Sequence, residues 1–283
     1  MFLKIKKIPI VNWSSDKPYN FKPKFSTFFF LCFGLILFGL GEGLLIVSFT
    51  GASPWSVLAQ GISLNINLSI GIITFLISVA VLSLWIPLGQ KPGMGTILNA
   101  IIIAIMIDLC IKFVPTPSNY IHQLILAVVS VITVGIGGGI YLVSNLGAGP
   151  RDGLMMGLQK ITNLPIAMVR ATLEISVVSI GWYLGGTVGI GTLLFAFGIG
   201  PCVALGLYLV DKIFNLQARG EMFVTHNDPV YAGMIVGLSP KPGDMIINVM
   251  KGKKLTNMRT QGTDENVVLT PVRKMSIAEQ LSM

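Results

Sequence analysis

A stretch of 184 residues constrains the fold of this chain more than any other feature. Residues 27–210 carry only nine charged side chains, and long apolar runs fill the stretch. Crossing a bilayer core of about 30 Å takes about 20 helical residues. Lipid offers no partners to backbone polar groups, and the alternation that a β-barrel needs is absent, so the runs are predicted to be helices. They cover about residues 27–49, 68–88, 95–113, 121–143, 166–184 and 189–210.

Composition excludes several classes of protein. Of the 283 residues, 53% are hydrophobic and 11% are charged, whereas soluble domains are about 25% charged. Of the net charge of +8, all but one unit lies outside the apolar stretch. We therefore expect a protein whose main partner is the lipid bilayer, and no nucleic-acid partner. The three cysteines lie in apolar runs without metal spacing, and no nucleophile–base set is present, so we predict no catalytic residues, no metal, no cofactor and no enzyme activity.

The positions of the basic residues orient the predicted spans. Positively charged loops stay on the cytoplasmic side of a membrane. The first 26 residues hold six lysines, the loop after the first span holds no charge, and the loop after the second holds Lys91. The connector at 144–165 holds Arg151 and Lys160, and the tail opens with Asp211 and Lys212. This alternation predicts six spans with both termini in the cytoplasm.

An internal repeat relates the two halves. A gapless offset of 96 residues places Gly51-Ala52-Ser53-Pro54 on Gly147-Ala148-Gly149-Pro150, and Gly93-Met94-Gly95-Thr96 on Gly189-Ile190-Gly191-Thr192. Each copy has three spans, and a second copy of an odd unit enters the membrane from the opposite side. The sequence thus predicts an all-α membrane protein built as a 3+3 inverted repeat, an architecture that recurs in carriers. The predicted parts are a basic cytoplasmic leader (1–26), two three-helix repeats (27–113 and 114–210) and a small C-terminal cytoplasmic appendage (211–283).

The connector at 144–158 carries a family resemblance. It reads Ser-Asn-Leu-Gly-Ala-Gly-Pro-Arg-Asp-Gly-Leu-Met-Met-Gly-Leu, and Gly189-Ile190-Gly191-Thr192 follows later. These residues resemble the signature of the YczE/YitT-like family of bacterial integral membrane proteins, over about residues 27–210. The resemblance implies a multi-pass protein of the bacterial inner membrane whose biochemical role is unsettled.

Paired breaks in the two halves point to a binding site. Ser53-Pro54 and Gly149-Pro150 each combine an N-cap residue with a proline suited to the first helical position. Broken segments at corresponding positions of inverted repeats mark the binding sites of carriers. The alternative is a pair of surface loops with interfacial helices. The predicted substrate-binding residues are Glu42, Ser53, Asn145, Arg151, Asp152 and Glu174.

The charged members of this set each have a structural alternative. A carboxylate within a span, such as Glu42, faces a cavity or a partner because ionised groups are costly in lipid. Arg151 can grip a carboxylate or phosphate, or it can simply fix the topology, and Asp152 can favour the helix dipole. Glu174 lies four residues after Arg170, on the same helical face, where a plain ion pair would form.

Small residues predict where helices pack. Gly39/Gly43 and Gly135/Gly139 form GxxxG pairs, which allow close approach of helix backbones. We expect them to seat the first and fourth spans against neighbours or each other. A homodimer through these faces is a further prediction.

Two functions remain open at this point. The first is a secondary carrier or exporter of a small solute, coupled to an ion. The second is a non-transporting accessory or regulatory membrane protein that acts through its tail. Within that tail, Met245–Met250 and Asn266–Leu269 are strand-like runs, so we expect a little β-structure or a partly disordered extension.

Overall fold

The computed structural model describes residues 8–216, 221–222 and 237–238. The chain divides into two compact units, residues 1–212 and 213–283. The described elements are α1 (Phe25–Val47), α2 (Pro54–Ile66), α3 (Ile70–Trp85), α4 (Met94–Phe113), α5 (Tyr120–Val143), α6 (Pro150–Thr162), α7 (Ile166–Tyr183), α8 (Ile190–Leu216), β1 (Glu221–Met222) and β2 (Gly237–Leu238).

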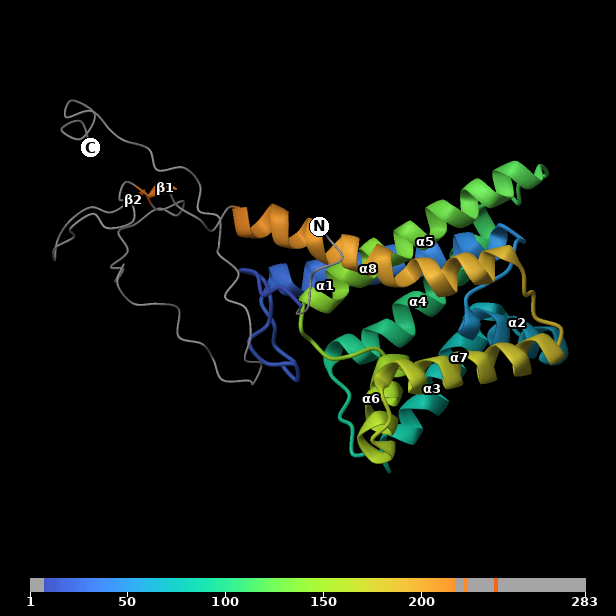
Figure 1. Ribbon diagram of the computed structural model, residues 1–283, viewed down its shortest axis with the longest axis horizontal. Coiled ribbons are helices and arrows are strands. Elements are labelled where there is room, and N and C mark those ends of the chain that lie inside the picture. The colour runs from blue at the N-terminus through green and yellow to red at the C-terminus, as the bar shows by residue number, and fades with distance from the viewer. Residues whose placement is uncertain (1–7, 217–220, 223–236, 239–283) are drawn as a thin grey trace. The chain divides into compact units, whose positions relative to one another are not determined.

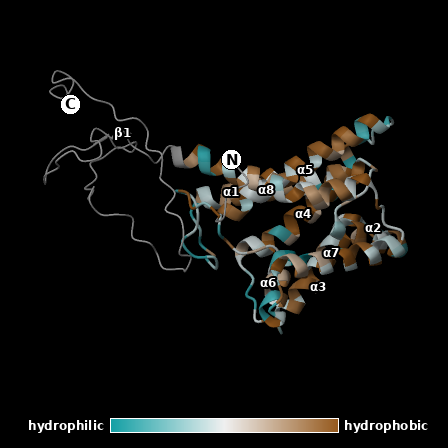
Figure 2. Ribbon diagram, viewed as in Figure 1, coloured by the Kyte–Doolittle hydropathy of each residue, from teal (hydrophilic) through white to brown (hydrophobic). Residues whose placement is uncertain are grey.

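Most of the predicted spans are confirmed as long apolar helices. Five helices are long and apolar enough to cross a membrane, namely α1, α4, α5, α7 and α8. The predicted span at 68–88 is shorter, because α3 has only 16 residues. It meets α2 at a bend of 114°, and the chain has a sixth candidate span if the two helices are counted together as one. Figure 2 shows how apolar the helices are, with hydrophilic residues gathered on α6 and at helix ends.

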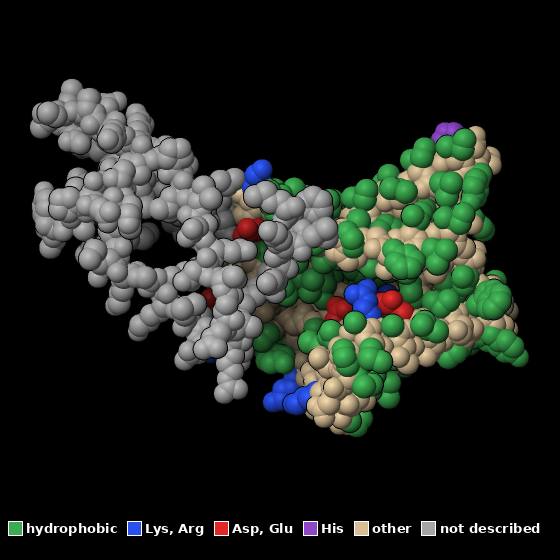
Figure 3. Space-filling view, viewed as in Figure 1, with side chains coloured by type: hydrophobic (Ala, Val, Ile, Leu, Met, Phe, Trp, Pro, Cys, Tyr) green, Lys and Arg blue, Asp and Glu red, His purple; other side chains and the backbone are tan. Residues whose placement is uncertain are grey.

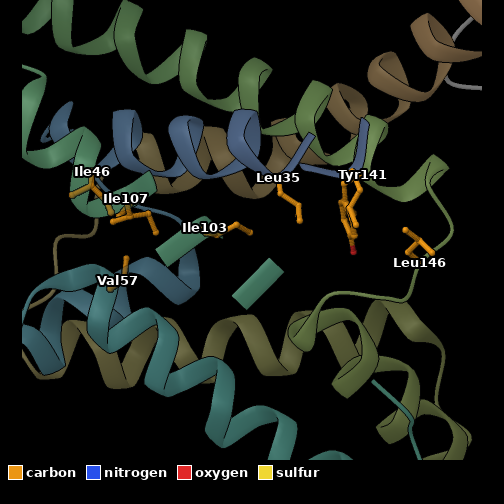
Figure 4. Close-up of a cluster of buried hydrophobic side chains, with 9 residues drawn as sticks. Leu35, Ile46, Val57, Ile103, Ile107, Tyr141 and Leu146 are labelled. Atoms are coloured by element: carbon orange, nitrogen blue, oxygen red, sulfur yellow. The ribbon is translucent and has the colours of Figure 1, made fainter. Parts of the chain in front are cut away.

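The helices of the first unit form two layers (Figure 1). The first layer contains α1, α4, α5 and α8, and the second contains α2, α3, α6 and α7. Each layer mixes helices from both halves of the sequence, since α1 packs along α5 and α2 packs along α7. A buried apolar cluster joins the layers, with Leu35, Ile107 and Tyr141 from the first and Val57 from the second (Figure 4).

Glycines set the spacing within the first layer. A side chain at Gly39 or Gly43 would run into Met106 or Cys110 of α4. One at Gly135 or Gly139 would run into Cys202 or Gly206 of α8. The predicted role in helix packing is therefore confirmed for both GxxxG pairs. Because α4 and α8 of the same chain cover these faces, the predicted homodimer would need another surface, and it stays a prediction.

The two halves share backbone detail at an offset of 96 residues. Phe49 and Asn145 are both left-handed, with φ of 54° and 51°. Gly51 and Gly147 have φ of 120° and 112°, a conformation that side chains other than glycine rarely adopt. The helices α2 and α6 each have 13 residues, begin with proline and end at a left-handed asparagine.

Contacts between the halves are reciprocal. The Gly95 N–H donates to the Leu146 carbonyl (2.8 Å), and the equivalent Gly191 N–H donates to the Thr50 carbonyl (2.9 Å). In the same way, Gly41 lies against Val134 of α5, while Gly137 lies against Phe38 of α1. In both cases a residue of one half contacts the other half just as its equivalent does in return, which is the pattern that a two-fold relationship produces.

The N-terminal residues from 8 onward fold against the first layer. Trp13 is buried and stacks on Phe30, with ring centroids 4.6 Å apart. The Thr27 hydroxyl donates to the Trp13 carbonyl (2.5 Å). We call residues 11–15 the strap. It is held at α1 and at the start of the connector to α6.

The tail is described only in part. β1 and β2 pair as a two-stranded antiparallel sheet. The strand-like runs Met245–Met250 and Asn266–Leu269 lie outside the described residues.

Candidate functional site

Glu42 is a buried carboxylate near the end of α1. Only 1% of the residue is exposed. Its Oε2 accepts hydrogen bonds from the Ser53 hydroxyl (2.6 Å) and the Ser56 hydroxyl (2.8 Å). A carboxylate in an apolar interior is tolerated when donors surround it, and here the donors come from the start of α2.

The segment 48–53, which we call the first break, brings these hydroxyls to Glu42. α1 ends at Val47, and the left-handed Phe49 and Gly51 turn the chain back. Ser53 then takes the N-cap position before Pro54, which leaves its hydroxyl free to bond Glu42 rather than the helix backbone. The first break and the start of α2 thus lie beside the isolated carboxylate.

Arg151 approaches Glu42 from the other half. It is the second residue of α6, just after the segment 144–149, which we call the second break. Its Nη1 lies 3.9 Å from Glu42 Oε1, and 22% of its side chain is exposed. The guanidinium also lies over the Trp55 ring, 5.4 Å from the centroid, a favourable cation–π position. Glu42 and Arg151 therefore form an ion pair between the two layers.

Asp152 is held by Tyr141 rather than by an arginine. The Tyr141 hydroxyl donates to Asp152 Oδ2 (3.1 Å) and accepts from the Gly149 N–H (2.8 Å). Figure 4 shows this hydroxyl pointing from α5 toward the second layer. Tyr141 thus fixes both the second break and the first turn of α6.

Glu174 forms the plain ion pair that its spacing allows. The Arg170 Nε donates to Glu174 Oε1 at 2.8 Å, within one exposed face of α7. Arg151 still interacts electrostatically with Glu174, as it does with Glu42 and Asp152. Figure 3 shows basic and acidic side chains together in the middle of this face, between the apolar surfaces of the two layers.

Asn145 has a different role from the other predicted site residues. Its amide donates to the Ser15 carbonyl (2.8 Å), and the Ser15 N–H donates to the Ser144 carbonyl (3.0 Å). These bonds tie the strap to the second break. The structure thus brings Glu42, Ser53, Arg151, Asp152 and Glu174 into one region and uses the Asn145 side chain to anchor the strap.

Sequence reasoning missed three members of the region. Trp55 and Ser56 occupy the positions that Arg151 and Asp152 occupy in the second half, so the repeat itself could have indicated them. Tyr141 follows the second GxxxG pair by two residues, and no pattern distinguishes it from the apolar residues around it.

A separate surface pocket lies at the opposite end of α6. It has a volume of about 360 Å³ and contains none of the predicted site residues. Its lining residues are Met156, Gln159, Lys160, Asn163 and Leu164.

Comparison with known proteins divides the chain at α8. Residues 25–207 match a family of unknown function, DUF6198. An uncharacterized protein of Haemophilus influenzae is 40% identical over 210 residues, which are 74% of this chain and 95% of that protein. The uncharacterized membrane protein YczE of Bacillus subtilis is 30% identical over 208 residues, 72% of this chain and 96% of that protein.

The tail is similar to a different protein, which the sequence reasoning did not find. Residues 204–283 match the TypA/BipA C-terminal domain. The large ribosomal subunit assembly factor BipA of Buchnera aphidicola is 46% identical over 77 residues, 27% of this chain and only 13% of that protein. No solved structure matches the chain.

Proposed function

Because the chain belongs, over residues 25–207, to the YczE-like DUF6198 family of membrane proteins, we propose that its membrane unit is a secondary carrier or exporter of a small solute, driven by an ion gradient. The observation that carries this proposal is the ion pair between Glu42 of the first half and Arg151 of the second. Charged groups are costly within a membrane unit, so those that are present often mark a functional site. This pair joins the two parts that would have to move.

The inverted repeat belongs to the same proposal. Reciprocal hydrogen bonds at Gly95 and Gly191 support a two-fold relation between the halves. Arg151 and Trp55 occupy equivalent positions and contact each other, and equivalent positions meet only close to a two-fold axis. In an inverted repeat that axis lies in the membrane plane. The ion pair would then lie near the middle of the bilayer, where carriers bind their substrates.

The proposed movement is a rocking of the two layers about this point. Glu42 is fixed to the first layer, whereas Arg151 is fixed to the second. A solute that binds between them would be exposed to one side of the membrane and then to the other. The helices that follow the two breaks, α2 and α6, begin beside the pair without a side-chain cap from Ser53 or Gly149. Helix N-termini favour anionic groups of a ligand.

Location in the bacterial inner membrane, with both termini cytoplasmic, completes the proposal. Reporter fusions after Gly61, Lys91, Pro117 and Lys160 test it, and we expect outside, inside, outside and inside. A periplasmic signal at Lys160 would contradict the inverted repeat.

Transport itself needs a direct test. We would compare the metabolites of a deletion strain with those of its parent, inside and outside the cells, without selecting a solute in advance. We expect the distribution of one small solute to change in the deletion strain. Returning the wild-type gene, or the control variant Lys160→Gln on the exposed end of α6, should restore that distribution. Glu42→Gln keeps the shape of the side chain but removes its charge, and we expect it to be expressed and inactive. Unchanged distributions in the deletion strain would contradict the carrier.

A second candidate function is the accessory role, and the similarity of the tail favours it. BipA is named as a large ribosomal subunit assembly factor, so the partner to test is the ribosome, although the sequence predicted no nucleic-acid partner. We would sediment ribosomal subunits with membranes that hold the full chain or a truncation after Leu216. We expect the truncation to insert normally. Co-sedimentation that needs the tail, together with unchanged solutes, would favour this role over transport.

A further inference from the structure

The guanidinium of Arg151 has unused hydrogen-bonding capacity. Within residues 8–216 it makes the 3.9 Å ion pair with Glu42 and the contact with Trp55, but none of its five N–H donors has a hydrogen bond. A guanidinium presents these donors as a planar fork that matches two oxygens of one group. With 22% of the side chain exposed, the fork is both held in place and accessible.

Glu42 leaves one oxygen unused at the same point. Its Oε2 accepts from two serine hydroxyls, whereas Oε1 is buried and has no hydrogen-bond partner in the described part of the chain. Arg151 Nη1 is the cation that faces Oε1, but 3.9 Å is too long for a hydrogen bond. A buried acceptor without a donor is unfavourable, and a proton on Oε1 would relieve it by creating a donor there.

The other charges of this region are already engaged. Asp152 accepts from Tyr141, and Arg170 donates to Glu174. With Glu42 and Arg151, these groups make three carboxylates and two guanidiniums, a formal charge of −1. A ligand that makes the charge of this region more negative would be penalised at membrane depth.

We propose that Arg151 and Glu42, on moving apart, bind a small carboxylate between them together with one proton. The incoming proton is taken up by the Glu42 carboxylate and forms the O–H of a neutral carboxylic acid. Arg151, released from its ionic partner, binds the carboxylate of the ligand through two N–H donors, and the Glu42 O–H donates to it. One positive and one negative charge enter together, so the charge of the region does not change.

The charge balance favours a monocarboxylate over a phosphate or an amine. A phosphate dianion would add a second negative charge that one proton cannot offset. A protonated amine would lie against the positive charge of Arg151, which would repel it. This inference rests on the proposed carrier function for its use in the cell, but binding can be measured without transport.

The test is calorimetric titration of the full-length chain in detergent with pyruvate. Repeating it in two buffers of different ionisation enthalpy counts the protons taken up, and we expect about one for each pyruvate bound. Arg151→Lys keeps the charge and loses the fork, so we expect affinity to fall by about tenfold or more. Arg151→Gln should abolish binding, and Lys160→Gln should leave it unchanged. Glu42→Gln should bind pyruvate without taking up a proton.

Several results would overturn the inference. They are no pyruvate binding by monodisperse wild type, equal binding by wild type and Arg151→Lys, proton uptake that persists in Glu42→Gln, or tighter binding of phosphate or methylammonium. Flux of labelled pyruvate into vesicles separates this inference from the proposed function. Binding without flux would contradict the carrier alone, whereas flux of another solute without pyruvate binding would contradict the carboxylate site alone.

Discussion

The two breaks have the same backbone and opposite chemistry. Both turn through a left-handed residue and a glycine, and both accept a hydrogen bond from the start of a helix in the other half. The first break and the start of α2 present neutral hydroxyls to a buried carboxylate. The second break leads into Arg151 and Asp152 at the start of α6 and is tied to the strap by Asn145. The backbone that the two halves share therefore positions the site, while the side chains that differ between the halves provide its charges.

The largest expected effect concerns the glycines that let α1 and α5 cross. A Cβ at Gly137 would lie 2.5 Å from the Phe38 nitrogen and 2.7 Å from the Gly34 carbonyl oxygen, both backbone atoms. Gly137→Ala should therefore destabilise the protein by about 3 kcal/mol. Thermal unfolding in detergent measures this.

The neighbouring glycine is the matched control. Gly138 is the equivalent of Glu42, and a Cβ there would be 3.4 Å from the nearest atom, a Val203 methyl carbon. Gly138→Ala should change stability by less than about 0.5 kcal/mol. Similar losses for the two variants would show that the reciprocal crossing of α1 and α5 is misplaced.

Next in size is the loss of the buried carboxylate. Glu42→Leu leaves two buried serine hydroxyls and Arg151 without their acceptor, which should cost about 2–4 kcal/mol. Glu42→Gln keeps an acceptor for the serines and should cost about half as much. Chemical unfolding in detergent compares the two variants. If Glu42→Leu leaves the free energy of unfolding unchanged, the first break does not depend on this carboxylate.

Equivalent threonines should differ in importance. The Thr96 hydroxyl accepts from the Gly93 N–H and donates to the Ala148 carbonyl (2.6 Å). Its equivalent, Thr192, accepts from Gly189 with a longer bond of 3.3 Å. Thr96→Val should cost about 1–2 kcal/mol and Thr192→Val about 0.5–1 kcal/mol. Thermal unfolding measures both losses. A larger loss of stability for Thr192→Val than for Thr96→Val would contradict the view that the second break is held more tightly than the first.

Small effects of opposite sign are expected at two left-handed residues. Phe49 adopts a conformation that asparagine tolerates better, and its side chain is exposed, so Phe49→Asn should stabilise by about 0.5 kcal/mol. Asn145→Ala loses both this tolerance and the bond to the strap, and it should destabilise by about 1 kcal/mol. Melting temperatures that move in the same direction for both variants would contradict this account.

Sequence reasoning located the helices and part of the site for identifiable reasons. Apolar runs of about 20 residues and paired glycines are local signals, so α1, α4, α5, α7 and α8 were predictable. The bend between α2 and α3 was not predicted, although a left-handed Asn67 ends α2 and the Ser69 side chain caps the start of α3. Glu42 stood out as a lone charge among apolar residues, whereas its serine partners and Tyr141 act through distances that only the fold creates.

The strap and the tail escaped prediction for different reasons. The strap lies in a segment that was expected to be a basic leader, but Trp13 and Val11 are apolar residues that bury themselves against the first layer. The similarity of residues 204–283 to BipA depends on the order of individual residues, which composition and turn signals do not capture.

The contact between Trp55 and Arg151 bears on how the two halves arose. If one gene gave rise to both, the ancestor was a pair of identical chains, and each residue on the axis faced its own copy. Two arginines in that place would have repelled each other, whereas two tryptophans could have stacked. An arginine could therefore become established at this position only after duplication and fusion had allowed the two copies to evolve separately. On this view, gene fusion came first, and the charge that the proposed chemistry needs came later.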